Sequence, residues 1–374
     1  MLQNKIYQNF LIEISKTFIL ILFGLSLVAL TVRAVSFLDL IVDNGYSMLT
    51  YLKYSLLNIF GIIPKFIPLS FLIALTVFIL KHLQDSEFVI LWTSGEKKIY
   101  VVNLFFFSSV AVLIFYLLLS TLITPLALNK SRLLLSSQNL NSFLPTVRMQ
   151  QFNDSFKGFT FIVEKKIGNE IQGIFLHDKG NNLKNFSSNT TKTKSTTIIS
   201  EKGIINLNKM LLFNGQIITS KKEDAKNEII KFEQLNIDLS NLNTTTIKKP
   251  KIQETSTFKL LNCLLTKNNR NSFCNEGFKK EILPTLNRRI IIPFYIPAIS
   301  LICSLLLMRS KKIYFNKTII FAYSFSLLLF TELAVRYTGL NNILLSLFII
   351  IPIFLFLFFY LFLNYKFLHE TSAS

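Results

Sequence analysis

Long apolar runs alternate with short charged segments at both ends of the chain. Six of these runs could each cross a bilayer core of about 30 Å, which takes about 20 helical residues. A more polar stretch, residues 127–287, separates the first three runs from the last three. The pattern predicts a membrane protein with three spans on each side of a large insertion. The runs lie at residues 14–37, 55–81, 99–126, 288–308, 317–336 and 341–364.

Within the insertion, from about Phe152, apolar and polar residues alternate with the period of two that is typical of half-buried strands. Asn214 and Gly215 predict a type I′ hairpin turn, because both residues tolerate positive φ. Short strands with turns at this spacing predict an antiparallel sandwich or an open barrel. The fold class is therefore α+β. Strands are expected at 158–164, 170–178, 196–200, 204–206, 210–213, 216–219 and 229–238, and helical patterns return at 256–265 and 275–289.

Lys and Arg residues near the span ends indicate which side of the membrane each segment faces, because cytosolic segments carry an excess of them. With a cytosolic N-terminus, ten such residues fall in cytosolic segments and four in the short outer segments and the second span, so both termini are expected inside and the insertion outside. The insertion is also basic, but a long translocated domain largely escapes this rule. The cytosolic ten are Lys5, Lys16, Lys81, Lys97, Lys98, Arg309, Lys311, Lys312, Lys317 and Lys366, and the outer four are Arg33, Lys53, Lys65 and Arg336.

The composition excludes a soluble enzyme, because 51% of the residues are hydrophobic and only 16% are charged. The net charge of +19 does not indicate nucleic-acid binding, since the charges flank the apolar runs instead of clustering on one element. The three Cys and three His residues show no metal-ligand spacing, so neither metal nor cofactor is expected. Cys263 and Cys274 could form a disulfide outside the cytosol, but two free thiols are the favoured interpretation.

The segment from Lys81 to Lys98 lies between the second and third spans and predicts a short helix at about residues 85–95. Asp85 or Ser86 is expected to cap its start, and Gly95 to end it in a left-handed conformation. Between these caps, residues 88–92 are all apolar, which no solvated loop requires. They could enter the bilayer surface around Trp92, pack on the protein's own helices, or fit a groove on another protein.

Four charged residues lie near the outer ends of spans. Lys65 sits between two prolines in the second span and Arg33 ends the first, while Glu332 and Arg336 are four residues apart in the fifth span and could pair on one helix face. Interfacial snorkelling or a structural ion pair would explain all four. Alternatively, the cations form a ring around an outward-opening cavity that receives an anionic ligand.

Sequence motifs for an internal energy source or a catalytic site are missing from the chain. It contains no phosphate-binding loop, no nucleophile elbow, no paired zinc-ligand histidines and no cysteine cluster. Glu332 is nearly the only acidic residue within the spans, so ion-coupled transport is not indicated either. If the protein performs work, another subunit must supply the energy.

Several segments resemble the LptF/LptG family, the membrane subunits of the lipopolysaccharide-export ABC transporter. The resemblance covers the three-plus-three layout and the motifs IPLSFLIAL at Ile67–Leu75 and DSEFVILWTSG at Asp85–Gly95, where Ser86, Glu87 and Gly95 match the family pattern. LNRRIIIPFY before the fourth span matches through Arg289 and Pro293. The segment Gly158–Asp178 is more similar to LptF than to LptG.

The resemblance implies a permease half that pairs with an LptG-like subunit and is driven by two copies of an LptB-like cytosolic ATPase. Its periplasmic partners would be LptC-like and LptA-like jellyroll proteins, with LptC regulating the complex and the β domain continuing into a periplasmic bridge. Arg33 matches the family's basic residue at the outer end of the first span, and the insertion would be a jellyroll. ATPase coupling is then expected at Ser86, Glu87, Val89, Leu91 and Gly95, and contact with lipid headgroups at Arg33, Lys65 and Arg336.

The expected organisation has residues 1–126 forming spans one to three with the coupling helix, and residues 127–287 forming a periplasmic β-jellyroll-like domain with flanking helices. Residues 288–374 then form spans four to six and a short cytosolic tail. The expected function is lipopolysaccharide export from the inner membrane without enzymatic activity. Two alternatives stay open: a membrane-anchored assembly or sensory module whose β domain binds an envelope ligand, and an intramembrane lipid enzyme using Glu332 and Arg336. Whether Trp92 faces the ATPase or the membrane is also open.

Overall fold

The computed structural model of the protein describes residues 5–42, 47–138, 149–156, 158–179, 193–206, 209–221, 227–238, 251–265, 276–308, 317–340 and 342–372. The chain divides into two compact units. The membrane unit contains the long apolar helices and joins Met1–Arg33, Leu56–Asn129 and Lys251–Ser374. The sheet unit joins Ala34–Ser55 and Lys130–Pro250. Cys274 and three of the cations expected in the cytosol, Arg309, Lys311 and Lys312, lie outside the described residues.

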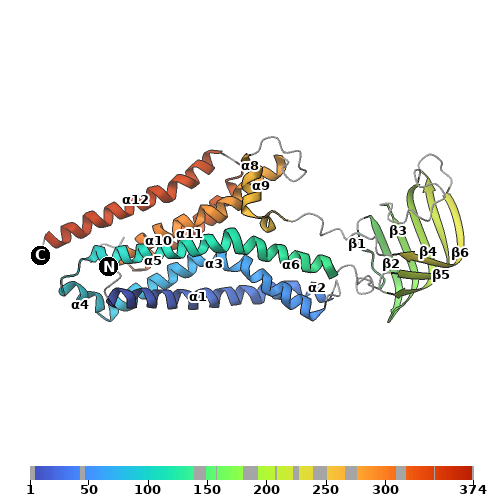
Figure 1. Ribbon diagram of the computed structural model, residues 1–374, viewed down its shortest axis with the longest axis horizontal. Helices are drawn as coiled ribbons and strands as arrows, with labels where there is room; N and C mark the ends of the chain where they lie inside the picture. The colour runs from blue at the N-terminus through green and yellow to red at the C-terminus, as the bar shows by residue number, and fades with distance from the viewer. Residues whose placement is uncertain are drawn as a thin grey trace. The chain divides into compact units, whose positions relative to one another are not determined.

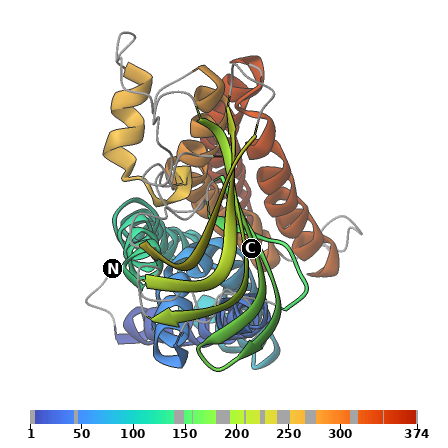
Figure 2. The same ribbon diagram turned by 90° about the vertical axis from the view of Figure 1, so that its right-hand side faces the viewer.

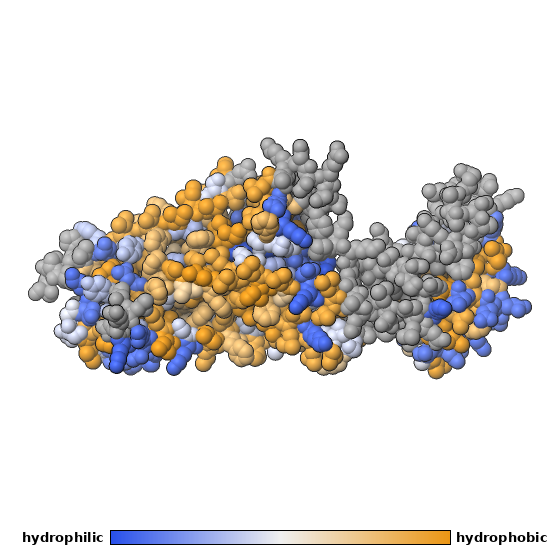
Figure 3. Space-filling model, in the orientation of Figure 1, coloured by the Kyte–Doolittle hydropathy of each residue, from blue (hydrophilic) through white to orange (hydrophobic). Residues whose placement is uncertain are grey.

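The described residues contain six helical segments that are long and apolar enough to cross a membrane, which confirms the six predicted spans. An apolar belt covers the visible face of these helices, and polar residues gather towards their ends (Figure 3). The first three spans are α1 (Lys5–Phe37), α3 (Met48–Gln84) and α5 (Lys98–Leu118), with the short helices α2 (Asp39–Val42) and α4 (Glu87–Thr93) between them. The last two are α11 (Lys317–Tyr337) and α12 (Asn342–Ser372).

Two of the spans are not single regular helices. The third span continues from α5 through a π-helical turn, η1 (Leu119–Ile123), into α6 (Thr124–Gln138). The fourth is built from α9 (Glu276–Ile290), η5 (Ile292–Phe294), α10 (Tyr295–Ser304) and η6 (Leu305–Leu307). Pro293 stands in η5, where its missing N–H group cannot support a regular α-helix.

The core of the membrane unit forms around α10, whose ten side chains are all buried. α10 contacts α5, α11 and α12, and α1, α3 and α5 lie lengthwise beside one another (Figure 1). α1 buries only a narrow stripe, so most of its surface faces away from the unit. The buried residues of that stripe are Tyr7, Phe10, Ile14, Phe18, Leu22 and Ser26.

Six strands form one antiparallel sheet in which every strand pairs with its neighbour in sequence. The strands curve strongly (Figure 2), and one face carries a continuous apolar core that includes Phe159, Leu176 and Met210. The described strands therefore do not form the two-sheet sandwich that the sequence left open. The strands are β1 (Asn153–Phe156), β2 (Phe159–Ile167), β3 (Glu170–Asp178), β4 (Thr193–Asn206), β5 (Lys209–Lys221) and β6 (Asn227–Asp238).

The hairpin predicted at Asn214 and Gly215 is wrong, because both residues lie inside the continuous strand β5. Residues on both sides of them pair with the same two neighbours, β4 and β6. Asn214 has a φ of 49°, and a side chain at Gly215 would collide with the carbonyl of Ile199. The conformational freedom that predicted a turn instead serves a local distortion within a long strand.

The segment that follows the sheet packs with the spans. η4 (Ile252–Glu254) and α8 (Thr257–Leu265) belong to the membrane unit together with α9. Leu260 of α8 is buried against Ile282 and Leu286 of α9. Cys263 of α8 is disulfide-bonded, whereas Cys303 is a free thiol, so the favoured interpretation of two free thiols in the insertion is wrong.

Candidate functional site

The helix α4 lies where the sequence predicts a coupling helix, between α3 and α5. Its predicted side-chain cap is not formed by Ser86, which has a φ of 59° and makes no capping hydrogen bond. A capping side chain needs an extended backbone to reach the first N–H groups, and the left-handed Ser86 lacks it. Gly95 has a φ of 95°, which confirms the prediction of a left-handed glycine after the helix.

The two faces of α4 differ in what they contact. Phe88 is fully buried and Leu91 is 6% exposed, and both belong to the core of the membrane unit. Val89 and Ile90 are 47% and 66% exposed. Among the residues expected to couple to an ATPase, Ser86, Glu87, Val89 and Gly95 are therefore exposed, but Leu91 faces the protein interior.

Trp92 packs on the protein's own residues. Its ring stacks on Phe88 with 5.9 Å between centroids, and Lys98 Nζ lies 4.8 Å from its centroid. The indole ring also belongs to the partly buried shell of the membrane core. Of the environments that the sequence left open for Trp92, the structure favours contact with the protein's own helices.

A cluster of charged residues occupies the ends of the spans opposite α4. Arg288 Nη2 lies 2.8 Å from Glu332 Oε2. No ion pair between Glu332 and Arg336 occurs among the described residues, so the predicted intrahelical pair is replaced by one between two helices. The guanidinium reaches Glu332 because α9 and α11 are neighbours.

Lys65 lies close enough to Arg33, Arg288 and Glu332 to interact with them electrostatically. α1, α3 and α9 thus each contribute one cation, and among the described residues the carboxylate of Glu332 partly balances them. We call Arg33, Lys65 and Arg288 the cation cluster. It combines Arg33 and Lys65, which the sequence singled out, with Arg288, which it did not.

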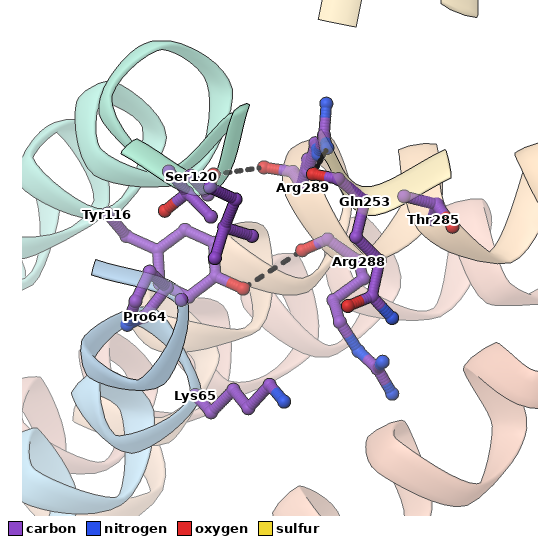
Figure 4. Close-up of a pocket in the computed structure, with 11 residues that line it drawn as sticks. Pro64, Lys65, Tyr116, Ser120, Gln253, Thr285, Arg288 and Arg289 are labelled. Carbon is purple, nitrogen blue, oxygen red and sulfur yellow. Dashed lines mark hydrogen bonds between the residues drawn. The ribbon is translucent and has the colours of Figure 1, made fainter. Parts of the chain in front are cut away.

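A pocket of the membrane unit lies beside this cluster, and Lys65 and Arg288 extend along the same side of it (Figure 4). The hydroxyl of Tyr116 donates to the carbonyl of Arg288 at 2.9 Å, and that of Ser120 donates to the carbonyl of Arg289 at 3.0 Å. These bonds fix the backbone of the two arginines against the third span. Gly61, Pro64, Thr124, Leu128, Gln253 and Thr285 complete the lining.

Arg289 has a different environment from Arg288. It is 5% exposed, and its guanidinium donates to the carbonyls of Gln253 and Thr255 and to the hydroxyl of Thr257. It therefore holds η4 and the start of α8 against α9. The arginine that carried the family resemblance is a structural residue, whereas its neighbour Arg288 belongs to the cation cluster.

The family model described as "Lipopolysaccharide export system permease LptF/LptG" matches residues 10–366. The chain belongs to the LptF/LptG family. No curated protein matches it. LptF/LptG proteins are transport permeases and not enzymes. The family and the six apolar helices together show that this chain is a multi-pass inner-membrane protein of the lipopolysaccharide export system.

For this LptF/LptG protein, the sequence predicted the two candidate sites, α4 and the cations at the opposite ends of the spans, but it missed individual residues of each site. At the end opposite α4, the available signal was the pair of adjacent arginines, Arg288 and Arg289, that directly precedes the fourth span. At the other end, His82 and Tyr7 contact the flanks of α4, and no motif marks either residue. Their contacts join residues up to 89 positions apart, which local patterns do not reveal.

Proposed function

We propose that this chain is a permease subunit of an ABC transporter that extracts lipopolysaccharide from the outer leaflet of the inner membrane. It would pass the lipid to a periplasmic bridge that leads towards the outer membrane. The observation that carries the proposal is the exposed apolar face of α4, formed by Val89 and Ile90 at one end of the spans. This face is suited to a groove on a cytosolic ATPase dimer of the LptB type.

The orientation required by this proposal has two independent supports. In the sequence, the short segments on the side of α4 hold ten Lys and Arg residues, whereas the short segments on the other side, together with the second span, hold four, which favours a cytosolic α4 and cytosolic termini. Cys263 in α8 is disulfide-bonded, and disulfides persist in the oxidising periplasm but rarely in the cytosol. Both arguments support the proposal that residues 127–287 lie outside the cytosol.

The cation cluster would receive the phosphates of lipopolysaccharide. Arg33, Lys65 and Arg288 carry three positive charges, and Glu332 forms an ion pair with one of them, Arg288. Cations near the outer ends of spans attract anionic groups more strongly than they would in bulk water, because the surrounding dielectric constant is lower. Arg336 would contribute from α11, although no contact joins it to the cluster among the described residues.

The sheet would carry the acyl chains. Its apolar core runs from β2 to β6. Asp178, the last residue of β3, is also buried on this face. We propose that residues 127–250 serve as the jellyroll domain that guides the lipid. LptC-like and LptA-like proteins would extend this route for the lipid through the periplasm. An LptG-like subunit would complete the membrane cavity.

The proposal is tested by placing a charge on the apolar face of α4 in the assembled complex. Val89→Asp and Ile90→Asp should each release the ATPase subunit during purification, while the permease still inserts. Gln84→Asp is a matched control, because it adds the same charge at an exposed position just before α4. Retention of the ATPase together with continued lipopolysaccharide release in Ile90→Asp would overturn the proposal.

A further inference from the structure

Both flanks of α4 contact the first third of α1. At the end of α4, the hydroxyl of Tyr7 donates to Glu96 Oε2 at 2.9 Å. At its start, His82 Nε2 lies 3.4 Å from Glu13 Oε2 and 3.3 Å from Glu87 Oε2. Tyr7 of α1 therefore contacts the end flank of α4 directly, and Glu13 of α1 contacts the start of α4 through His82.

Apolar contacts fill the space between these polar ones. The ring of Phe10 on α1 contacts Phe88 on α4 with 5.9 Å between centroids, in edge-to-face geometry. Phe10 also contacts His82 at 5.0 Å and Phe78 at 5.4 Å. Edge-to-face aromatic pairs favour a defined relative orientation, so α4 is held at a fixed angle to α1.

His82 is 2% exposed, and its orientation is defined on both sides of the ring. Its Nδ1 lies 2.9 Å from the carbonyl of Phe78, so Nδ1 carries a proton and donates it. Nε2 is thereby directed at the carboxylates of Glu13 and Glu87. Lys81 Nζ also bonds Glu13, at 2.7 Å, which fixes that carboxylate beside the imidazole.

α1 itself is suited to transmit a displacement. It is one continuous helix of 33 residues, which corresponds to about 50 Å. Tyr7, Phe10 and Glu13 lie near one end, and Arg33 of the cation cluster lies near the other. Because α1 buries only one stripe against its own unit, it can shift with less repacking than a fully buried helix such as α10.

We propose that Tyr7, Glu13 and His82 are positioning residues that pass a displacement of α4 to α1, and through α1 to the cation cluster. This inference rests on the proposed function, since it takes α4 as the place where the ATPase acts. It goes further by assigning the motion to α1 and by naming the contacts that carry it. Losing these contacts should uncouple ATP hydrolysis from lipid release without releasing the ATPase.

The test uses the complete complex in proteoliposomes and measures lipopolysaccharide released per ATP hydrolysed. Tyr7→Phe removes one hydroxyl, and Glu96→Gln removes the charge of its acceptor. Each should lower the ratio about three- to tenfold while the ATPase stays bound and hydrolyses ATP. The double variant should match Tyr7→Phe alone, because Glu96→Gln weakens the same hydrogen bond that Tyr7→Phe removes. Tyr323→Phe is the control, since it makes the same chemical change at an exposed position of α11.

An unchanged ratio in Tyr7→Phe and Glu96→Gln would overturn the inference. Effects of the two changes that simply add would also overturn it, because the residues would then act separately. Failure of the proposed function has a different signature, namely an ATPase that stays bound to Ile90→Asp. His82→Phe retains an aromatic ring among Phe10, Phe78 and Phe88 but loses both ring nitrogens, and it should reproduce the loss seen with Tyr7→Phe.

Discussion

Arg288 and Glu332 form an ion pair between α9 and α11, with Nη2 and Oε2 2.8 Å apart. The two helices run in opposite directions here: Gly339, just after α11, lies against the carbonyl of Lys280 near the start of α9, whereas Glu332 lies beside Arg288 near the end of α9. The glycine thus permits a close approach, and Glu332 comes to lie beside Arg288 farther along both helices. The pair belongs to the packing of the spans and also limits the positive charge of the cation cluster.

Neutralising the acid of this pair should leave transport intact. Glu332→Gln is expected to change the free energy of unfolding by at most about 1 kcal/mol, because both side chains are partly exposed to solvent. Thermal unfolding in detergent and lipopolysaccharide release would measure the two effects. Complete loss of release with normal stability would contradict a purely structural role for this ion pair.

Removing a cation of the cluster should weaken binding of the lipid. Lys65→Ala and Arg288→Ala are each expected to reduce the affinity for lipopolysaccharide about three- to tenfold, which is about 0.6–1.4 kcal/mol. Binding of a labelled lipopolysaccharide at two salt concentrations would test this, and the loss should be smaller at high salt. Lys259→Ala on α8 is the control, and an equal loss in that variant would mean that general positive charge is responsible.

Truncation of two neighbouring residues of α4 should have different effects on the stability of the protein. Leu91→Ala removes a buried side chain and should lower the free energy of unfolding by about 2–4 kcal/mol. Ile90→Ala removes an exposed one and should leave stability nearly unchanged. Thermal unfolding of the purified permease would distinguish them. Equal destabilisation by both changes would contradict the two-faced arrangement of α4.

Arg289 should be sensitive even to conservative replacement. Its guanidinium donates to three acceptors from one buried position, and a lysine cannot reproduce that planar geometry. Arg289→Lys should therefore loosen η4 and increase proteolysis near Gln253 in the full-length protein. Arg288→Lys should leave cleavage there unchanged, because Arg288 does not bond this segment in the described structure.

Gly215 should tolerate no larger residue. Gly215→Ala places a side chain against the carbonyl of Ile199, so we expect faster hydrogen exchange in β4 and β5 of the full-length protein. Gly24→Ala is the control, since no atom lies within 4 Å of the added carbon and alanine favours a helix. Unchanged exchange in Gly215→Ala would mean that the strand can relax at low cost.

The sequence predicted most of the membrane architecture because crossing a bilayer imposes a length and an apolarity that no other structure requires. The strands β3 and β6 were also located closely, since their alternation is regular. Asn214 and Gly215 were misassigned because a turn and a strand distortion need the same backbone freedom. The pairing of β5 with β4 and β6 decides between a turn and a strand distortion, and this pairing joins residues that lie far apart in the sequence.

Pattern and composition by themselves determined that the chain spans a membrane six times, carries an inserted antiparallel sheet, presents an apolar helix near residues 85–95 and gathers cations near its outer ends. The tertiary structure decided which side chains meet. In the structure Leu91 is buried and Ile90 is exposed, and Arg289 is buried. Glu332 forms an ion pair with Arg288, and Tyr7 forms a hydrogen bond with Glu96. The reason is physical: bilayer insertion and local periodicity act on consecutive residues, whereas an ion pair or a buried contact depends on how whole helices pack.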